Sequence, residues 1–198
     1  MKQSKKRGPF VKEGQLRIIG GEWRGRKLTF KAVEGLRPTP DRVRETLFNW
    51  LGMVVPGASC IDLFAGSGAL GLEALSRGAA EVIFVENSSV AVAQLKENLK
   101  KLNSSNGQAE SMQAQQFLSQ LTKPVDIAFL DPPFRQELLA PCIKLLSKPN
   151  MLVEGGWVYI ETGLDEVLPA VPEHWQLHRQ KTAGQVCYRL FQVQAFSC

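Results

Sequence analysis

The chain has 198 residues, of which 44% are hydrophobic, and this suits one soluble globular domain with a full core and a small appendage. No apolar stretch approaches the roughly 20 residues that a membrane span requires, and the basic N-terminus lacks the apolar core of a signal peptide. The four cysteines include no C-x-x-C pair, which argues against a zinc knuckle or a redox dithiol. We therefore expect a cytoplasmic monomer with no membrane segment and no metal site.

Positive charge is concentrated at the N-terminus. Residues 1–44 contain 13 Lys or Arg against 4 Asp or Glu, whereas residues 45–198 contain 11 against 15, and these balances of +9 and −4 add to the net +5. Because Lys and Arg neutralise phosphates and release condensed counterions, this asymmetry predicts a polyanionic partner. For residues 1–14 the favoured alternative is a solvated tail, since the segment has little apolar surface to bury.

The residues after this tail predict a short β-hairpin around Gly20-Gly21. Its two arms contain the apolar residues Leu16, Ile18, Ile19, Leu28 and Phe30. Cationic residues surround the turn, namely Arg24, Arg26 and Lys27. A hairpin that carries such residues indicates a nucleic-acid contact. We assign residues 1–36 to a basic tail with a nucleic-acid-binding hairpin and residues 37–198 to the main domain.

The next segment predicts a helix that begins near residue 40. Thr39 is a suitable N-cap residue, and Pro40 suits the first helical position. One face of this helix is apolar and is expected to pack on the core: Val43, Leu47, Trp50 and Leu51. Three arginines around its N-terminal end are predicted to bind RNA, with a phosphate or the cofactor carboxylate as the hypothetical ligand: Arg37, Arg42 and Arg44.

From residue 58 onward, predicted strands and helices alternate. Strands are expected at 58–63, 81–86, 108–113, 125–130 and 156–161, with helices at 69–77, 89–102, 115–121 and 136–147. This alternation predicts a doubly wound α/β fold, in which a mostly parallel sheet is covered on both faces. Two further strand-like runs, 175–180 and 185–193, predict an antiparallel hairpin that closes the sheet.

Two of the predicted strands end in residues suited to a nucleoside ligand. Asp62 ends one strand, and the G-x-G-x-x-G pattern of residues 66–71 lets the backbone approach a ligand at a helix N-terminus. Glu86 ends the next strand, where its carboxylate can accept hydrogen bonds from ribose hydroxyls; a surface carboxylate is the weaker alternative. The cofactor-binding residues expected from these two segments are Asp62, Phe64, Gly66, Ser67, Gly68, Glu86 and Asn87.

The glycine pattern alone does not separate NAD from S-adenosylmethionine. Asp62 lies four residues before the first glycine, where a carboxylate would repel a pyrophosphate. The same carboxylate can hold the ammonium group of a methionine moiety, directly or through water. The 198 residues also leave no second domain to position a hydride acceptor, so S-adenosylmethionine is favoured.

The tetrapeptide Asp131-Pro132-Pro133-Phe134 follows the strand predicted at 125–130. An exocyclic amino group on a base is a poor nucleophile, because its lone pair is delocalised into the ring. The Asp131 carboxylate and the Pro132 carbonyl can accept its two N–H bonds, the prolines hold these acceptors rigidly, and Phe134 can stack on the base. A simple strand-terminating turn is the alternative, and the nearby glycine loop and Glu86 favour the catalytic interpretation.

These motifs resemble the bacterial 16S ribosomal RNA guanine-N2 methyltransferase family over nearly the whole chain. The matching segments are Arg17-Ile18-Ile19-Gly20-Gly21, Arg24-Gly25-Arg26-Lys27-Leu28, residues 37–45, residues 62–68, residues 131–134 and Lys181-x-x-Gly184. The arginine-rich block is the specific part, because many amino methylases share the glycine loop and the tetrapeptide. The resemblance implies a seven-stranded class I methyltransferase domain over residues 37–198, with S-adenosylmethionine as the donor.

The resemblance also implies the substrate, which is the N2 amino group of one guanine in 16S rRNA. The small ribosomal subunit or an assembly intermediate would present this guanine, and the N-terminal hairpin would bind RNA. Where the family places an acid for the adenine amino group of the donor, this chain has Gln113, whose amide oxygen can accept the same bond.

Two other functions compete with this expectation. One is methylation of adenine N6 in DNA or RNA with the same tetrapeptide, although a DNA enzyme usually needs an added recognition domain. The other is a ribosome-assembly or RNA-binding factor with an inactive methylase fold. An inactive factor is disfavoured because the acids and glycines of the site are present together: Asp62, Gly66, Gly68, Glu86 and Asp131.

Overall fold

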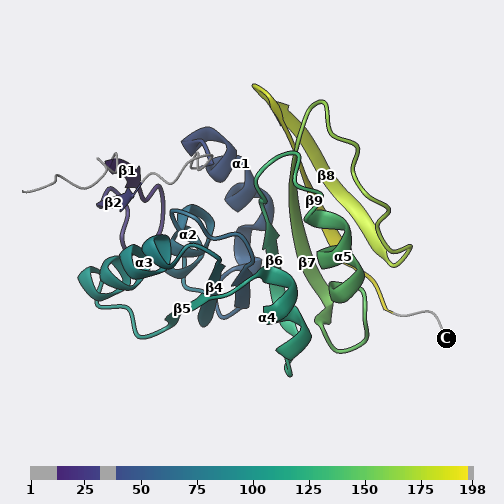
Figure 1. Cartoon of the computed structure of the whole chain (residues 1–198), viewed down its shortest axis with the longest axis horizontal. Helices are drawn as coiled ribbons and strands as arrows, with labels where there is room; N and C mark the ends of the chain where they lie inside the picture. The colour runs from purple at the N-terminus through teal and green to yellow at the C-terminus, as the bar shows by residue number, and fades with distance from the viewer. Residues whose placement is uncertain (1–12, 32–38, 196–198) are drawn as a thin grey trace, which may run out of the picture.

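The computed structural model describes residues 13–31 and 39–195, and its main element is one mixed β-sheet (Figure 1). In this part of the chain, seven strands of that sheet lie in the order β5-β4-β3-β6-β7-β9-β8. They are β3 (Ser59–Asp62), β4 (Glu81–Glu86), β5 (Gly107–Ser111), β6 (Val125–Leu130), β7 (Leu152–Gly163), β8 (Trp175–Ala183) and β9 (Val186–Val193). Strands β3 to β7 run parallel, and β9 pairs antiparallel with β7 and with β8. The predicted seven-stranded, mostly parallel α/β fold is confirmed.

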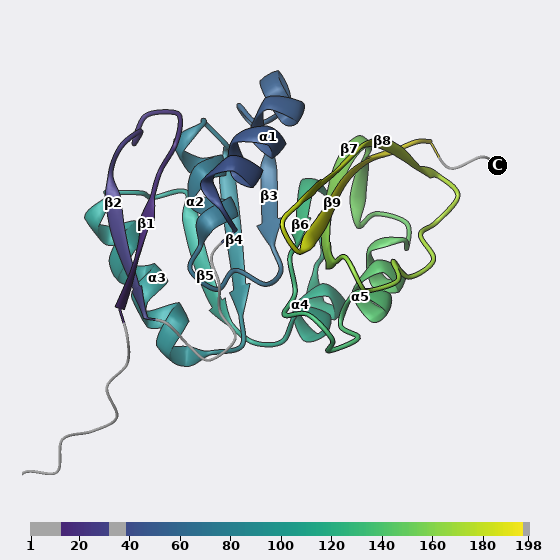
Figure 2. The ribbon, with the colours of Figure 1, turned by 90° about the horizontal axis from the view of Figure 1, so that it is seen from above.

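Helices cover both faces of the sheet. They are α1 (Asp41–Leu51), α2 (Ala69–Ser76), α3 (Ser89–Lys101), α4 (Ala114–Gln120) and α5 (Leu139–Leu146), with a short 3-10 helix, η1 (Gly52–Val54), after α1. One core cluster contains residues of α1, α2 and α3, and the other contains residues of α4 and α5. Figure 2 shows α4 and α5 across the sheet from α1. None of the helices in the described part of the chain has the length and hydrophobicity required to cross a bilayer.

The central strands are apolar on both faces because helices cover both sides of the sheet. In β6, for example, Phe129 belongs to the core cluster under α1, whereas its neighbour Leu130 belongs to the cluster under α4 and α5. Such two-sided burial explains why β3, β4 and β6 lack the alternating pattern of a half-exposed strand. The point where each of these strands ends in a polar residue can therefore be recognised in the sequence.

Two helix starts differ from the sequence prediction. Pro40, and not Thr39, is the N-cap residue of α1, and it makes no side-chain capping bond. Helix α5 begins at Leu139 instead of residue 136, because Arg135 and Glu137 have positive φ angles of 62° and 51°. Such angles lie outside the α-helical region, so the segment before α5 is a loop.

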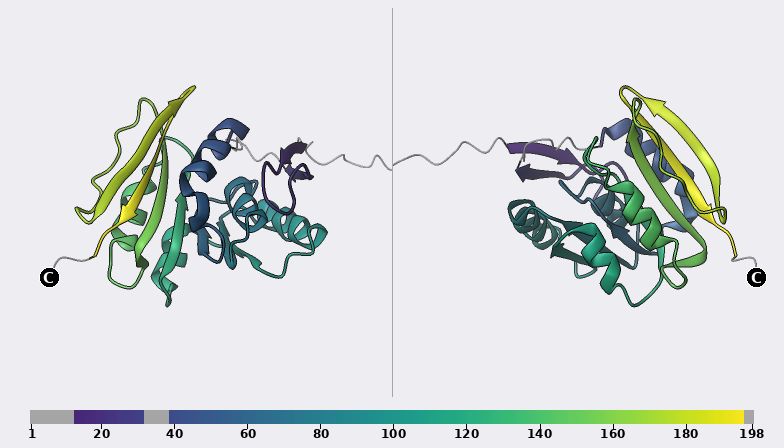
Figure 3. Two further views of the ribbon diagram at one scale, coloured as in Figure 1. Left: turned by 180° about the vertical axis from the view of Figure 1, so that it is seen from behind. Right: turned by 45° about the vertical axis from the view of Figure 1, so that its right-hand side comes forward.

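The N-terminal hairpin shares its core with the rest of the molecule. Strand β1 (Glu13–Arg17) pairs antiparallel with β2 (Lys27–Lys31), as predicted. Apolar side chains of both strands belong to the same buried cluster as α2 and α3, and the Asn98 side chain of α3 donates a hydrogen bond of 2.9 Å to the Thr29 carbonyl. Figure 3 shows this hairpin in purple and the β8–β9 hairpin in yellow at opposite ends of the molecule. The predicted boundary between residues 36 and 37 lies outside the described residues.

Candidate active site

The candidate site lies where the order of the sheet reverses. From β3 the chain continues through β4 to β5 on one side, whereas β6 and β7 occupy the other side. Ligands of open α/β sheets bind at such a reversal, beyond the carboxyl ends of the strands. Asp62 ends β3 and Asp131 follows β6, so the two predicted acids flank this position.

The glycine loop connects β3 to α2 through backbone conformations that favour glycine. Gly68 is the N-cap residue of α2 and has a φ angle of 80°. A Cβ atom there would lie 2.4 Å from Cδ2 of Leu95, so the close packing of α2 and α3 excludes a side chain. Gly66 also has a positive φ of 51°, while Ser67 is buried and Phe64 is half-buried. The loop thus brings the first turn of α2 to the carboxyl edge of the sheet.

Glu86 joins the two loops that border this edge. Its Oε2 atom accepts a hydrogen bond of 2.9 Å from the Gly66 amide, and Oε1 accepts one of 2.7 Å from the Ser88 amide. Two of about four acceptor positions on the carboxylate are therefore used within the protein. Its contact with a ribose stays a prediction, as do the roles of Asn87 and Gln113, which are exposed. Gln113 is the N-cap residue of α4 and forms no side-chain capping bond there.

Asp62 is almost completely buried, with 1% of its surface exposed. Its Oδ2 atom accepts a hydrogen bond of 3.0 Å from the Gly71 amide in the first turn of α2. Burial raises the pKa of Asp62 to about 7, and the negative charges of Asp131 and Glu86 act in the same direction. A cationic group of a ligand placed beside this carboxyl would favour its charged form.

Asp131 is held by a residue that the sequence analysis assigned to another role. Thr39 is buried, and its Oγ1 atom donates a hydrogen bond of 2.9 Å to Oδ2 of Asp131. Burial raises the pKa of Asp131 to about 6, and the hydrogen bond from Thr39 opposes this shift. Of the other residues in the tetrapeptide, Pro132 is buried, Pro133 is exposed and Phe134 is 42% exposed. The aromatic ring is thus accessible to a base.

The loop after Phe134 is fixed to the end of β7. The Glu166 carboxylate accepts hydrogen bonds from the backbone amides of Arg135 and Gly163. The Arg135 side chain also forms an exposed ion pair of 2.7 Å with Asp165. These contacts hold Arg135, which has a positive φ angle and directly follows Phe134.

Glu161 is a further candidate site residue, and the sequence analysis missed it. It lies near the end of β7, is only 3% exposed, and accepts a hydrogen bond of 2.7 Å from the Tyr159 hydroxyl. Burial and the charge of Asp131 raise the pKa of Glu161 to about 8. The available signal was an acid at the end of a predicted parallel strand, the same signal that identified Asp62 and Glu86.

Most of the predicted RNA-binding cations are on the surface. Arg24, Arg26 and Lys27 are exposed at the turn and the start of β2, and Arg42 is exposed on α1. Arg37 lies outside the described residues, as do residues 1–12 of the tail predicted over residues 1–14. The last two residues of that predicted tail, Glu13 and Gly14, belong instead to strand β1. The role of the four exposed residues in binding RNA remains a prediction.

Arg44 does not belong to this exposed group, and its predicted contact with RNA is corrected here. It is 1% exposed, and its Nη2 atom donates hydrogen bonds of 2.6 Å to Asp41 and 2.9 Å to the Arg17 carbonyl. Its Nη1 atom lies 3.5 Å from the buried carboxylate of Glu73. Glu73 in turn accepts hydrogen bonds of 2.9 and 2.8 Å from the backbone amides of Ile19 and Gly20. Arg44 and Glu73 therefore anchor the hairpin to α1 and α2.

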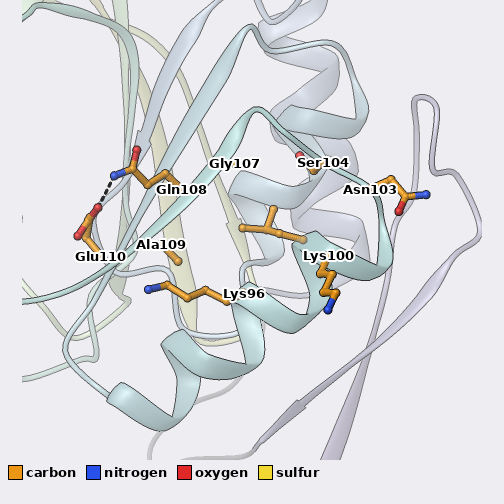
Figure 4. A pocket seen from close by; sticks show the side chains of 9 residues that line it. Lys96, Lys100, Asn103, Ser104, Gly107, Gln108, Ala109 and Glu110 are labelled. Atoms are coloured by element: carbon orange, nitrogen blue, oxygen red, sulfur yellow. Dashed lines mark hydrogen bonds between the residues drawn. The ribbon is translucent and has the colours of Figure 1, made fainter.

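A hollow of the described surface lies away from these residues. It has a volume of about 580 Å³ and lies between α3 and the edge strand β5, lined by Lys96, Leu99, Lys100, Asn103, Ser104 and residues 107–110 (Figure 4). No predicted site residue lines it, so we do not assign the active site to this hollow. Across residues 13–31 and 39–195, no group of three or more His, Cys, Asp or Glu side chains is arranged to hold a metal ion.

Comparison with known proteins identifies the family. A family model described as "Conserved hypothetical protein 95" matches residues 16–192. The chain belongs to this family. This member of the Conserved hypothetical protein 95 family is 52% identical over 182 residues to ribosomal RNA small subunit methyltransferase D of Escherichia coli strain K12, with 92% of each chain covered. It is 48% identical to the protein of the same name from Haemophilus influenzae, covering 91% of this chain and 95% of that one.

Solved structures agree with this family assignment. A structure described as a putative methyltransferase, yhhF, from Escherichia coli matches with a TM-score of 0.85 at 52% identity, covering 92% of this chain and 99% of that one. A putative methylase from Haemophilus influenzae matches with a TM-score of 0.79 at 44% identity, covering 92% and 100%. The seven-stranded sheet of this Conserved hypothetical protein 95 family member is thus that of known methyltransferase structures.

Proposed function

We propose that this protein transfers a methyl group from S-adenosylmethionine to the exocyclic N2 of one guanine in 16S rRNA, within the small ribosomal subunit or an assembly intermediate. The observation that carries this proposal is the position of Asp131, which follows β6 beside the glycine loop and accepts a hydrogen bond from Thr39. Relatives named ribosomal RNA small subunit methyltransferase D, at 52% and 48% identity, support rRNA methylation as the activity.

The residues at the carboxyl edge of the sheet fit S-adenosylmethionine, which supplies a methyl group activated by a sulfonium centre when bound. Glu86 would hold the ribose with the acceptor positions that Gly66 and Ser88 leave unused. Asp62 is a buried carboxyl that no ion pair of the described residues includes, and it suits the ammonium group of the methionine moiety. Gln113 would accept the adenine amino group.

The tetrapeptide would orient the amino group of the base. With Thr39 bound to Oδ2 of Asp131, the other oxygen, Oδ1, can accept one N–H of the substrate. The Pro132 carbonyl would accept the second N–H, and Phe134 would stack on the base. These bonds favour a pyramidal nitrogen whose lone pair is aimed at the methyl group. In the transfer, the nitrogen–carbon bond would form as the sulfur–carbon bond breaks, and the amine proton would leave to Asp131 or to water.

The hairpin would provide the electrostatic contact with RNA. The exposed cations around its turn are Arg24, Arg26 and Lys27, and Arg42 on α1 adds a fourth predicted contact. Because Arg44 and Glu73 fix the hairpin to the helices that begin beside the site, RNA bound to the hairpin would stand in a fixed relation to Asp131. This arrangement supports a large, folded substrate over a free nucleotide.

The first experiment is methyl transfer from labelled S-adenosylmethionine to unmodified small ribosomal subunits, naked 16S rRNA and duplex DNA in parallel, followed by nucleoside analysis. We expect N2-methylguanosine from the ribosomal samples alone. Label in methyladenine would move the assignment to adenine N6. Donor binding without label in any sample would instead favour an assembly factor. The Asp131→Ala variant serves as the control for contaminating activity.

A further inference from the structure

Glu161 is a second carboxyl group beside the proposed methyl-accepting position. Because Leu130 of β6 is the register partner of Ile160 of β7, the next residues, Asp131 and Glu161, follow side by side on neighbouring strands. Neighbouring strands lie about 4.8 Å apart, and residues in register point to the same face of a sheet. The Glu161 side chain is therefore on the Asp131 side of β7, in the row that faces α1.

Among residues 13–31 and 39–195, no cation forms an ion pair with Glu161. The Tyr159 hydroxyl donates to it from the same strand, Asp131 stands at the end of β6, and Tyr188 of β9 is its register partner. From α1, Trp50 stacks on Tyr188 at 5.3 Å. From β8, the register partner of Tyr188 is Lys181, which is exposed. No ion pair within the described residues includes Glu161.

Glu161 is 3% exposed and has no cationic partner among the described residues, and such burial favours the protonated form of a carboxyl group. Asp131 is the more acidic of the two groups, since the pKa values are raised to about 6 for Asp131 and to about 8 for Glu161. At neutral pH the pair thus holds one proton, mainly on Glu161, and carries one negative charge. A positive charge placed beside the pair would expel that proton.

We propose that Glu161 senses the sulfonium charge of the bound donor, so that the site binds S-adenosylmethionine more tightly than the demethylated product. This inference rests on the proposed function, in which the amine held by Asp131 meets the methyl group that the sulfonium carries. The product, S-adenosylhomocysteine, keeps the ammonium and carboxylate groups but has a neutral sulfur. The two ligands therefore differ only at the position that faces Asp131 and Glu161.

The proton on Glu161 makes this discrimination measurable. Donor binding lowers the pKa of Glu161 and releases its proton to solvent, whereas product binding leaves the proton in place. Because a proton is released, the affinity for the donor relative to the product rises with pH. Asp62 faces the ammonium group that both ligands share, so its contribution cancels in the comparison.

The test is isothermal titration calorimetry of the full-length protein with each ligand at pH 7, in two buffers of different ionisation enthalpy. We expect S-adenosylmethionine to release about half a proton or more beyond the count for S-adenosylhomocysteine. We also expect the ratio of the product Kd to the donor Kd to rise about tenfold between pH 6.5 and pH 8.5. Equal proton counts for the two ligands would overturn the inference.

Three variants test whether Glu161 causes the difference in proton release. Glu161→Gln keeps the shape of the side chain and an acceptor for Tyr159, and it should abolish the difference in proton release. Glu154→Gln, at an exposed position near the start of β7, should retain it. Tyr159→Phe removes a hydrogen bond that lowers the pKa of Glu161, so it should move the rise in the ratio to higher pH. A difference that persists in Glu161→Gln would assign the sensing to another group and overturn the inference.

Two controls separate this inference from the proposed function. Binding of S-adenosylhomocysteine at pH 6.5 shows whether Glu161→Gln is folded, and Tyr159→Phe tests the inference with Glu161 intact. The calorimetry contains no RNA, so a failure to methylate the small subunit would leave its result unchanged. Equal proton release in an enzyme that does produce N2-methylguanosine would reject only the role of Glu161.

Discussion

The hydroxyl of Thr39 donates a hydrogen bond of 2.9 Å to the carboxylate of Asp131 across 92 positions of the chain. The bond joins the segment before α1 to the tetrapeptide after β6, and it lowers the pKa of an acid that burial makes weaker. It also fixes the rotamer of Asp131, because a bonded carboxylate oxygen cannot turn freely. Thr39 is thus a positioning residue for the group proposed to hold the substrate amine.

Replacing Thr39 with Val should shift the acid limb of the activity profile. Without the hydrogen bond, the pKa of Asp131 rises from about 6, so a higher pH is needed to obtain the carboxylate that accepts the amine. We expect kcat at pH 6.5 to fall about tenfold, with partial recovery at pH 8. Thr46→Val, which removes a hydroxyl that donates to the Arg42 carbonyl on the surface, is the matched control. An unchanged pH profile would contradict the role of Thr39.

Replacing Asp131 with Ala should separate donor binding from methyl transfer. The substitution removes the acceptor that orients the amine, so we expect kcat to fall roughly 100- to 1000-fold. Donor affinity, measured by calorimetry, should change by less than about threefold, because the main donor contacts are proposed to come from Asp62 and Glu86. Turnover close to that of the unmodified protein would exclude Asp131 from the reaction.

Removing the three cations of the hairpin turn should weaken RNA binding and its dependence on salt. For the combined Ala variant of Arg24, Arg26 and Lys27, we expect the slope of log K against log salt to decrease by about two to three. A matched triple variant of exposed lysines near α4 and α5 should retain the slope: Lys123, Lys144 and Lys148. If both variants behave alike, the hairpin is not the RNA contact.

The anchor of the hairpin should be important for stability. Glu73→Gln removes the negative charge beside the buried guanidinium of Arg44, and breaking such a buried pair costs about 3–5 kcal/mol. Arg17→Ala removes an exposed partner of Asp41 and should cost at most about 1 kcal/mol. Urea denaturation of the two variants compares these free energies of unfolding. A Glu73→Gln variant as stable as the unmodified protein would show that the network does not anchor the hairpin.

The ligand-free protein should lose stability as the pH rises toward 8. The pKa values of Asp62, Asp131 and Glu161 are raised to about 7, 6 and 8, whereas unfolded carboxyl groups titrate near about 4. The folded state therefore binds more protons, and the stabilisation present below pH ~4 is lost as the pH rises through these values. We expect the Tm to be about 5 °C lower at pH 8 than at pH 5.5. Glu161→Gln should reduce this decrease, and a Tm that rises with pH would contradict the shifts.

The structural features that the sequence predicts best are those that depend on residues close together in the chain. The apolar runs of β3, β4 and β6 end in polar residues, so the positions of Asp62, Glu86 and Asp131 at strand ends could be read directly. The glycines of the loop after β3 were also evident, because a positive φ at Gly68 favours that residue. These features fixed the expected fold and the edge of the sheet that carries the site.

Contacts between distant segments could not be predicted in this way. Threonine is a common N-cap residue, and Thr39 stands just before a predicted helix. Nothing beside it in the sequence indicates a bond to Asp131. Arg44 lies among charged residues of a helix and resembles a surface residue until α2 brings Glu73 beside it. In both cases tertiary packing supplied a partner that outweighed the local preference.

Helix α2 is a spacer of fixed length between the candidate active site and the N-terminal hairpin. In its first turn, the Gly71 amide donates a hydrogen bond to Asp62. In its last turn, Glu73 accepts a hydrogen bond from the Gly20 amide, and the Ser76 hydroxyl donates one of 2.6 Å to the Gly20 carbonyl. These two bonds hold the hairpin. One inserted residue would rotate the last turn by about 100° and advance it by about 1.5 Å, breaking the contacts at one end. Insertions should therefore be tolerated in the surface loops of this protein but not in α2.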